Sequence, residues 1–291
     1  MSRWLAYAGA PVLLRDALWS PAHSLIDQSP RAELATAATG GDGHGLGWYG
    51  AGGAPGVFRS IEPAWNDANL RELAGSVTSP LFFAHVRSSS GTAVQRTNCH
   101  PFRHGRWLWM HSGAINGFDA IKRDVVLDVD PTLYPSIEGQ TDSEVLFYLA
   151  LTLELEDDPS SAVMGAIALV EAAGRRRGVE HPFKGTIATT DGERLWVFRY
   201  SSEGRSRPLY LTTDVPTLEH LYPGLAQHGQ LSEDTRLVVS GPLAEPTGAW
   251  SEVPESSYAV IAGEEADIHP FTPPRSPRAQ RPVHVAGSWR S

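Results

Sequence analysis

Cysteine is nearly absent from this sequence: the 291 residues include one, Cys99. A single cysteine excludes an intramolecular disulfide framework and any zinc or iron–sulfur site built from several thiolates, and it fits a reducing compartment. The chain also lacks any apolar stretch close to the about 20 residues that a membrane-spanning helix requires. Its first residues show no signal-peptide pattern. We therefore expect a cytoplasmic protein that does not enter a membrane.

Positive charge is also scarce, with 24 Lys and Arg against 33 Asp and Glu and a formal net charge of -9. Nucleic acids and anionic membranes are bound through basic surfaces, so neither is an expected partner. The basic run at 175–177 follows a helical pattern, where it suits the negative end of the helix dipole. We interpret that run as structural.

Short apolar segments punctuated by Gly and Pro predict a strand-rich chain with inserted helices. Thr141 followed by Glu144 has the pattern of a capping box and predicts a helix start. Strands on both sides of two consecutive helices indicate an α+β fold with helices outside paired sheets. We expect one domain over 2–262 and a flexible Pro- and Arg-containing tail over 263–291. Strands are predicted at 4–8, 80–86, 107–115, 185–190, 195–200, 209–213, 235–240 and 258–262, and helices at 66–77, from 141 and at 160–173.

Polar residues follow several of these segments: Ser2, Arg87, Ser112 with Gly113, and Asp142. Each has an ordinary structural explanation. An Arg after a strand is usually solvated or ion-paired, an Asp behind a Thr at a helix start is usually part of a cap, and Ser-Gly after a strand is usually a turn. The order of these residues along the chain is the more specific signal.

These polar residues lie in or next to six ordered blocks of sequence. Together the blocks resemble the class II glutamine amidotransferases, which are N-terminal-nucleophile hydrolases. The similarity is greatest to the stand-alone bacterial branch that includes the γ-glutamyl amide hydrolases of ergothioneine synthesis. The blocks are RWLAY at 3–7, GDGHGLGWY at 41–49, HVRSSSG at 85–91, TNCHPF at 97–102, WMHSGAI at 109–115 and GQTDSE at 139–144.

The resemblance implies a four-layer αββα sandwich in which residue 2 becomes the chain start after Met1 is removed. Ser2 would then be the nucleophile, and its own α-amino group, with a pKa of about 7.7 to 8.0, would be the base. Gly113 would offer a backbone N–H to the oxyanion. No metal or other cofactor is implied.

The resemblance also assigns the substrate's amino acid end. Arg87 would hold the α-carboxylate through its two-pronged guanidinium, and Asp142 would hold the ammonium. Ser90 and His111 complete the substrate-binding set. The expected reaction is hydrolysis of glutamine or another γ-glutamyl amide, with ammonia passed to a separate synthase or simply released.

Two departures from the family pattern fall on the catalytic groups. The family nucleophile is Cys, where this chain has Ser2, and the family's oxyanion-hole Asn is here Ser112. Three explanations stay open: a slower enzyme or one adapted to another amide, a homologue that binds glutamine or a γ-glutamyl compound without turnover, and serines introduced to trap a complex.

Other kinds of site find less support. His100, His104 and His111 lack a carboxylate partner at a recognised metal-ligand spacing. The Gly-rich segment 41–50 lacks the Lys-Ser/Thr of a phosphate-binding loop and opens no helical pattern. Cys99 is interpreted as a small buried residue.

Overall fold

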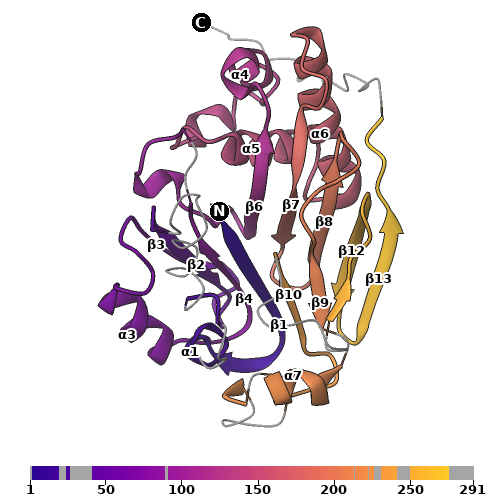
Figure 1. Cartoon of the computed structure of the whole chain (residues 1–291). Coiled ribbons are helices and arrows are strands. Elements are labelled where there is room, and N and C mark those ends of the chain that lie inside the picture. Colours follow the sequence, from indigo (N-terminus) through magenta and orange to yellow (C-terminus); the bar gives the residue numbers. More distant parts are fainter. Residues whose placement is uncertain are drawn as a thin grey trace, which may run out of the picture.

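The computed structural model describes residues 2–19, 24–26, 41–88, 91–212, 214–221, 223–225, 231–240 and 250–274. These residues build two antiparallel sheets (Figure 1). The first sheet contains, in spatial order, β11 (Trp250–Glu252), β9 (Tyr210–Thr212), β10 (Arg236–Val239), β1 (Arg3–Leu13), β4 (Thr78–Val86), β2 (His44–Trp48) and β3 (Gly56–Ser60). The second contains β13 (Glu265–Pro270), β12 (Ser257–Ala262), β8 (Leu195–Ser201), β7 (Phe183–Thr190), β6 (Trp107–Ile115) and β5 (Phe102–His104).

Helices cover the outer face of each sheet. Asp67 caps α3 through the amides of Asn69 and Leu70, and Thr141 caps α5 through the amide of Glu144, as side-chain oxygens at helix starts commonly do. The first sheet is covered by α1 (Leu14–Leu18), α3 (Ala68–Ser76) and α7 (Val215–Leu221), and the second by α4 (Phe118–Val126), α5 (Asp142–Thr152) and α6 (Pro159–Arg176). Two short 3₁₀ helices are η2 (Arg96–Asn98) and η3 (Tyr134–Ser136).

Strand β1 shows how the layers separate. Leu5 and Tyr7 pack in the core under α1 and α3, whereas Trp4 and Ala6 pack in the core between the sheets, as the two-residue period of a strand requires. The Trp4 indole crosses to the second sheet and donates a hydrogen bond to the Thr186 hydroxyl (3.1 Å). Since β1 pairs with β10 on one side and β4 on the other, the chain start lies at the centre of the molecule (Figure 1). The expected α+β sandwich with outer helices is confirmed.

The capping pattern at α5 differs in one respect from the expected box. The Thr141 hydroxyl accepts from the Glu144 amide (3.2 Å), as predicted. The Glu144 carboxylate, however, accepts from the amides of Glu138 (2.9 Å) and Gly139 (2.7 Å) rather than reaching back to Thr141. Glu144 therefore fixes the segment that leads into the helix.

The boundary expected at residue 262 is wrong. Residues Glu265–Pro270 form β13, which pairs along its length with β12, and Phe271 is fully buried against Phe198 and Tyr200. The signal was weak because β13 is an edge strand whose side chains are mostly exposed, so it shows little alternation. The rest of the expected tail, 275–291, lies outside the described residues.

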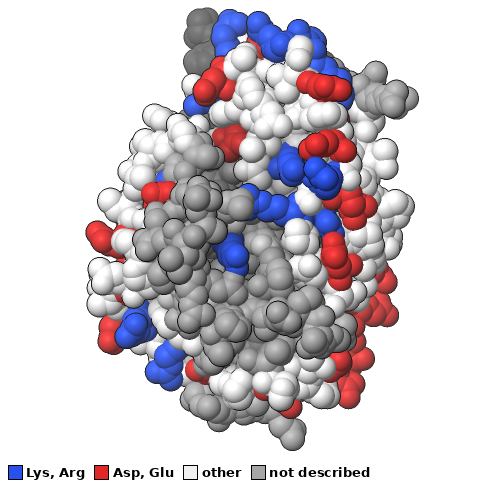
Figure 2. Space-filling view, viewed as in Figure 1, with Lys and Arg blue, Asp and Glu red and all other residues white. Residues whose placement is uncertain are grey.

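The basic run at the end of α6 makes ion pairs within this fold. Arg175 contacts Glu171 one turn back (3.0 Å), and Arg177 contacts Asp124 of α4 (2.9 Å). Lys and Arg side chains gather at this end of the molecule (Figure 2). Among the described residues, no helix is both long and apolar enough to cross a membrane.

Candidate active site

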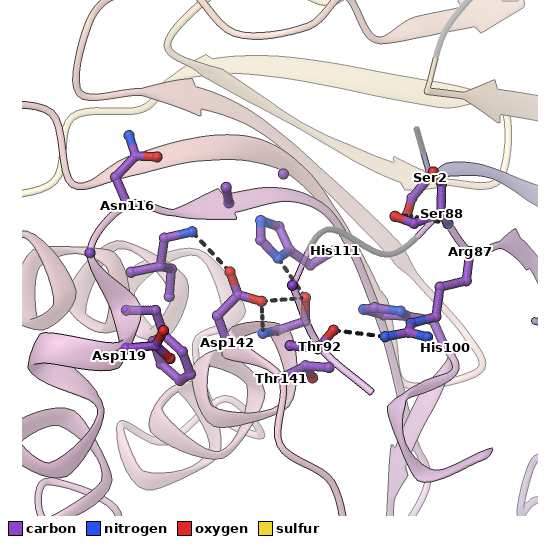
Figure 3. Close-up of a pocket in the computed structure, with 17 residues that line it drawn as sticks. Ser2, Arg87, Ser88, Thr92, His100, His111, Asn116, Asp119, Thr141 and Asp142 are labelled. Atoms are coloured by element: carbon purple, nitrogen blue, oxygen red, sulfur yellow. Dashed lines mark hydrogen bonds between the residues drawn. The ribbon is translucent and has the colours of Figure 1, made fainter. Parts of the chain in front are cut away.

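A cavity of about 360 Å³ lies where the start of β1, the ends of β4 and β6, and the start of α5 meet (Figure 3). Its lining includes Ser2, Arg87, His111, Gly113 and Asp142, all of which the sequence singled out. These residues are far apart in the chain, and the two sheets bring them to one site. For the other two predicted residues the outcome is different. Ser112 is not part of the lining, and Ser90 lies outside the described residues.

Ser2 is held at the cavity by main-chain and side-chain contacts. Its hydroxyl donates to the Ser88 carbonyl (3.2 Å) and accepts from the Ser88 amide (3.1 Å). The Ser112 hydroxyl donates to the Ser2 carbonyl (3.1 Å). In this arrangement Ser112 fixes the position of Ser2 instead of pointing a donor into the cavity. Sequence reasoning did not find Ser88, because it acts through its peptide groups.

Arg87 directly follows β4 and is almost completely buried, with 4% of its surface exposed. Its guanidinium donates to the carbonyls of Asp42 (3.2 Å) and Ala93 (3.2 Å) and to the Thr92 hydroxyl (2.7 Å). The acceptors in these three contacts are neutral, and together they orient the guanidinium. A fixed, buried guanidinium of this kind suits a carboxylate ligand.

Asp142 is the first residue of α5 and ties that helix to β6. One carboxylate oxygen accepts from the Ile115 amide (2.9 Å), and the other accepts from the amide (2.8 Å) and hydroxyl (3.3 Å) of Ser143. The cap itself is Thr141, so the ordinary explanation of Asp142 as the capping residue does not apply. These donors hold a carboxylate at the cavity wall, where it can meet a cation.

Comparison with known proteins identifies the family of this chain. The family model described as glutamine amidotransferases class-II matches residues 19–261. The chain belongs to this family. The yeast protein named probable glutamine amidotransferase DUG3 (Saccharomyces cerevisiae) is 33% identical over 302 residues, which cover 93% of this chain and 84% of that protein.

Two further similar proteins agree with this family. The gamma-glutamyl-hercynylcysteine sulfoxide hydrolase of Mycolicibacterium smegmatis is 33% identical over 119 residues, covering 40% of this chain and 52% of that protein. The solved glutamine aminotransferase class-II domain protein of Silicibacter pomeroyi superposes with a TM-score of 0.70 at 31% identity, covering 93% of this chain and 100% of that one. The family and the fold are therefore as predicted.

His111 supports the wall of the amidotransferase cavity. Its Nδ1 lies 2.9 Å from the Ser143 hydroxyl, and its ring stacks on Phe183. Its Nε2 lies against Gly113 and Gly185, where an added Cβ on either glycine would collide with the ring. Burial lowers the pKa of His111, and the nearby Asp142 opposes that shift. The His111 ring packs so closely on the β6–β7 pair that the two positions beneath it, Gly113 and Gly185, must lack side chains.

Ser143 joins Asp142 to His111, a link that the sequence did not predict. We expect Ser143→Ala to raise the KM for glutamine about tenfold with little change in kcat, because one hydrogen bond to a charged group is lost and Asp142 is less well positioned. Steady-state kinetics measures KM and kcat separately. Ser160→Ala removes an equivalent hydroxyl beside Asp158 at the start of α6 and should leave both constants unchanged. An unaltered KM in Ser143→Ala would show that the link does not position Asp142.

His85 and His100 form a buried pair behind Arg87. Their rings stack at 4.3 Å between centroids, and none of their ring nitrogens has a hydrogen-bond partner among the described residues. Burial, with smaller contributions from Arg87 and His111, lowers the pKa of His85 to about 3. Burial and the neighbouring His85 also lower the pKa of His100. Both rings are therefore neutral in the folded protein.

This pair makes the stability of the protein depend on pH. An unfolded histidine has a pKa of about 6.5, so below that pH the unfolded chain binds a proton that folded His85 does not, and the free energy of unfolding falls by about 1.4 kcal/mol per pH unit. Above pH 6.5 the histidine is neutral in both the folded and the unfolded chain, so the free energy of unfolding no longer changes with pH through His85. Between pH 6.5 and 5.0 the wild-type protein should lose about 2 kcal/mol of unfolding free energy through His85. This part of the loss should be absent in His85→Phe, as measured by urea unfolding. Replacement of the half-exposed His181 by Asn is the matched control. An unchanged loss in His85→Phe would contradict the assignment.

The histidines and glycines that the sequence offered for other kinds of site have different surroundings in the described part of the chain. Within the described ranges, no group of three or more His, Cys, Asp or Glu residues is placed to hold a metal ion. His104 packs edge-on against Tyr148 and lines a different cavity from His100 and His111. The Gly-rich segment forms strand β2, whose Gly45 and Gly47 lie against the backbone of His100 and the ring of Pro101. These glycines allow close strand packing and form no phosphate loop.

Proposed function

We propose that the protein hydrolyses glutamine or another γ-glutamyl amide through the hydroxyl of Ser2. One observation carries the proposal: a nucleophile candidate, a buried guanidinium and a held carboxylate line the same cavity of about 360 Å³. Membership of the class II amidotransferases supports it, as does similarity to a protein named as a γ-glutamyl hydrolase.

The two charged residues recognise the free amino acid end of the substrate. Arg87 attracts and hydrogen-bonds the α-carboxylate through its positively charged guanidinium. Asp142 binds the α-ammonium with an oxygen already oriented by backbone donors. The γ-amide then extends toward Ser2. Binding both charges of the same small molecule fixes its reacting carbonyl, which is the main benefit of positioning in such reactions.

Removal of Met1 frees the α-amino group of Ser2, which titrates near neutral pH and serves as the base. The amine takes the proton from Ser2 Oγ as that oxygen attacks the amide carbon. The Gly113 backbone N–H stabilises the resulting oxyanion. The α-ammonium then protonates the leaving nitrogen as the C–N bond breaks, which leaves an ester on Ser2. Attack by water on that ester releases glutamate and restores the hydroxyl.

The fate of the nitrogen is a further part of this proposal. The released ammonia or amine either diffuses away or passes to a separate acceptor enzyme. The presence of only one cysteine supports a reducing compartment such as the cytoplasm.

Intact-mass analysis and covalent labelling test the proposal. The purified protein should lack Met1, and a diazoketone analogue of glutamine should add once, at Ser2, with excess glutamine preventing the addition. Glutamate release from glutamine should accompany labelling. A retained Met1, or the absence of both adduct and glutamate, would overturn catalysis through Ser2. Saturable binding of glutamine without adduct or glutamate would identify a protein that binds without turnover.

A further inference from the structure

A second cavity, of about 490 Å³, lies next to the amidotransferase cavity. Helix α5 and the segment before it contribute to both: Asp142 and Ser143 line the first, whereas Glu138 and Glu144 line the second. Nothing in the proposed reaction uses this second space. Its lining is mainly polar, with guanidinium groups from three separate elements.

The three guanidiniums belong to Arg59 on β3, Arg96 on η2 and Arg103 on β5. We propose that they bind the oxyanion group, phosphoryl or carboxylate, of a small metabolite. Guanidinium groups present paired donors that match the oxygens of these anions. Convergence of three such groups from different elements on one concave space is the geometry of a binding site for a small anion.

Two carboxylates, Glu138 and Glu144, share this cavity with the three guanidiniums, so its lining carries one net positive charge. Both oxygens of Glu144 accept backbone amides, those of Glu138 and Gly139, so this carboxylate is committed to the segment before α5. Glu138 contacts Arg59 at 3.4 Å, but its own side chain is 58% exposed. An exposed ion pair of this length contributes little. A stronger anion can therefore take the place of Glu138 beside Arg59.

The rest of the lining sets the size and type of occupant. Phe102, His104 and Tyr148 provide an aromatic side to the cavity, and the Tyr148 hydroxyl is already used on the Ser136 carbonyl (2.8 Å). Arg103 also donates to the Pro55 carbonyl (3.1 Å), which holds its side chain in place. A protein with a net charge of -9 repels extended polyanions. The site therefore suits a small anion with a flat or apolar portion rather than a nucleic acid.

Calorimetric titration of the full chain with inorganic phosphate, and separately with succinate, tests this proposal without requiring any enzymatic activity. At low ionic strength we expect saturable binding of one equivalent of at least one probe, with a dissociation constant below about 1 mM. Binding of phosphate alone identifies a phosphoryl ligand, and binding of succinate alone identifies a carboxylate ligand.

Variants locate the binding. Arg96→Gln and Arg103→Gln should each weaken it at least tenfold, and because both side chains are exposed, unfolding curves should match that of the wild type. Arg176→Gln removes the same charge from the exposed end of α6 and should change the affinity less than twofold. Absence of binding by both probes, or equal weakening by Arg176→Gln, would overturn the proposal.

Discussion

Replacing Ser2 by Ala should lower the rate of glutamine hydrolysis by at least about 10⁴-fold, since loss of the nucleophile costs the most of any catalytic change in comparable hydrolases. The substitution removes the hydroxyl that contacts both peptide groups of Ser88 and leaves the Ser2 carbonyl available to Ser112. Alanine is also small enough at position 2 for Met1 to be removed. The chain start should therefore keep its place while losing its reactive atom.

Measurements of rate and binding together make this test specific. Glutamate release should be lost in Ser2→Ala, whereas calorimetry should show glutamine affinity within a few-fold of the wild type, because Arg87 and Asp142 are unchanged. Ser2→Cys retains a nucleophile and should retain turnover. If Ser2→Ala kept more than about one hundredth of the wild-type rate, the nucleophile would have to be another group.

Asp142→Asn should reduce kcat/KM for glutamine by about 10² to 10³, through a rise in KM. Breaking a buried, hydrogen-bonded charge pair by removing one partner costs about 2 to 5 kcal/mol. Asparagine has nearly the same shape, but both oxygens of Asp142 accept backbone amides. The NH₂ group would therefore face a donor at one of them. The substitution both removes the charge and disturbs the position of the side chain.

A substrate without an ammonium group separates the loss of the Asp142 charge from the displacement of its side chain. The des-amino analogue of glutamine keeps the carboxylate and the γ-amide but has no ammonium, so wild-type activity on it should already be low. Asp142→Asn should then cause no more than about a threefold further loss on the analogue, because the pair that it breaks is missing. A loss of equal size on both substrates would mean that Asp142 acts through Ile115 and Ser143 and does not contact the ammonium.

The sequence predicted the strands that carry the site because their patterns are strong. The apolar run at 107–115 matches β6 residue for residue, and the end of the run at 86 places Arg87 directly after β4. Helix α4 was not predicted, although Phe118 and Asp119 line one end of the cavity. This helix follows Gly117 with no side-chain cap, so the usual start signal is missing.

Within the site, residue types could be read from the blocks but contacts could not. The role of Ser112 illustrates this limit: the sequence places it at the family's oxyanion position, whereas the structure shows its hydroxyl on the Ser2 carbonyl. A three-dimensional contact decides which way a short side chain points. The same holds for Ser143, whose bond to His111 joins positions 32 residues apart.

The central place of β1 also bears on how the protein should be produced. Trp4 donates its amide to the Ser240 hydroxyl (2.8 Å), and β1 pairs with β4 from Arg3 and with β10 from Leu5. A purification handle fused ahead of Ser2 would therefore emerge at the candidate active-site cavity, and in the proposed reaction it would block the amine that acts as the base. Expression vectors for this enzyme should carry the handle at the carboxyl end.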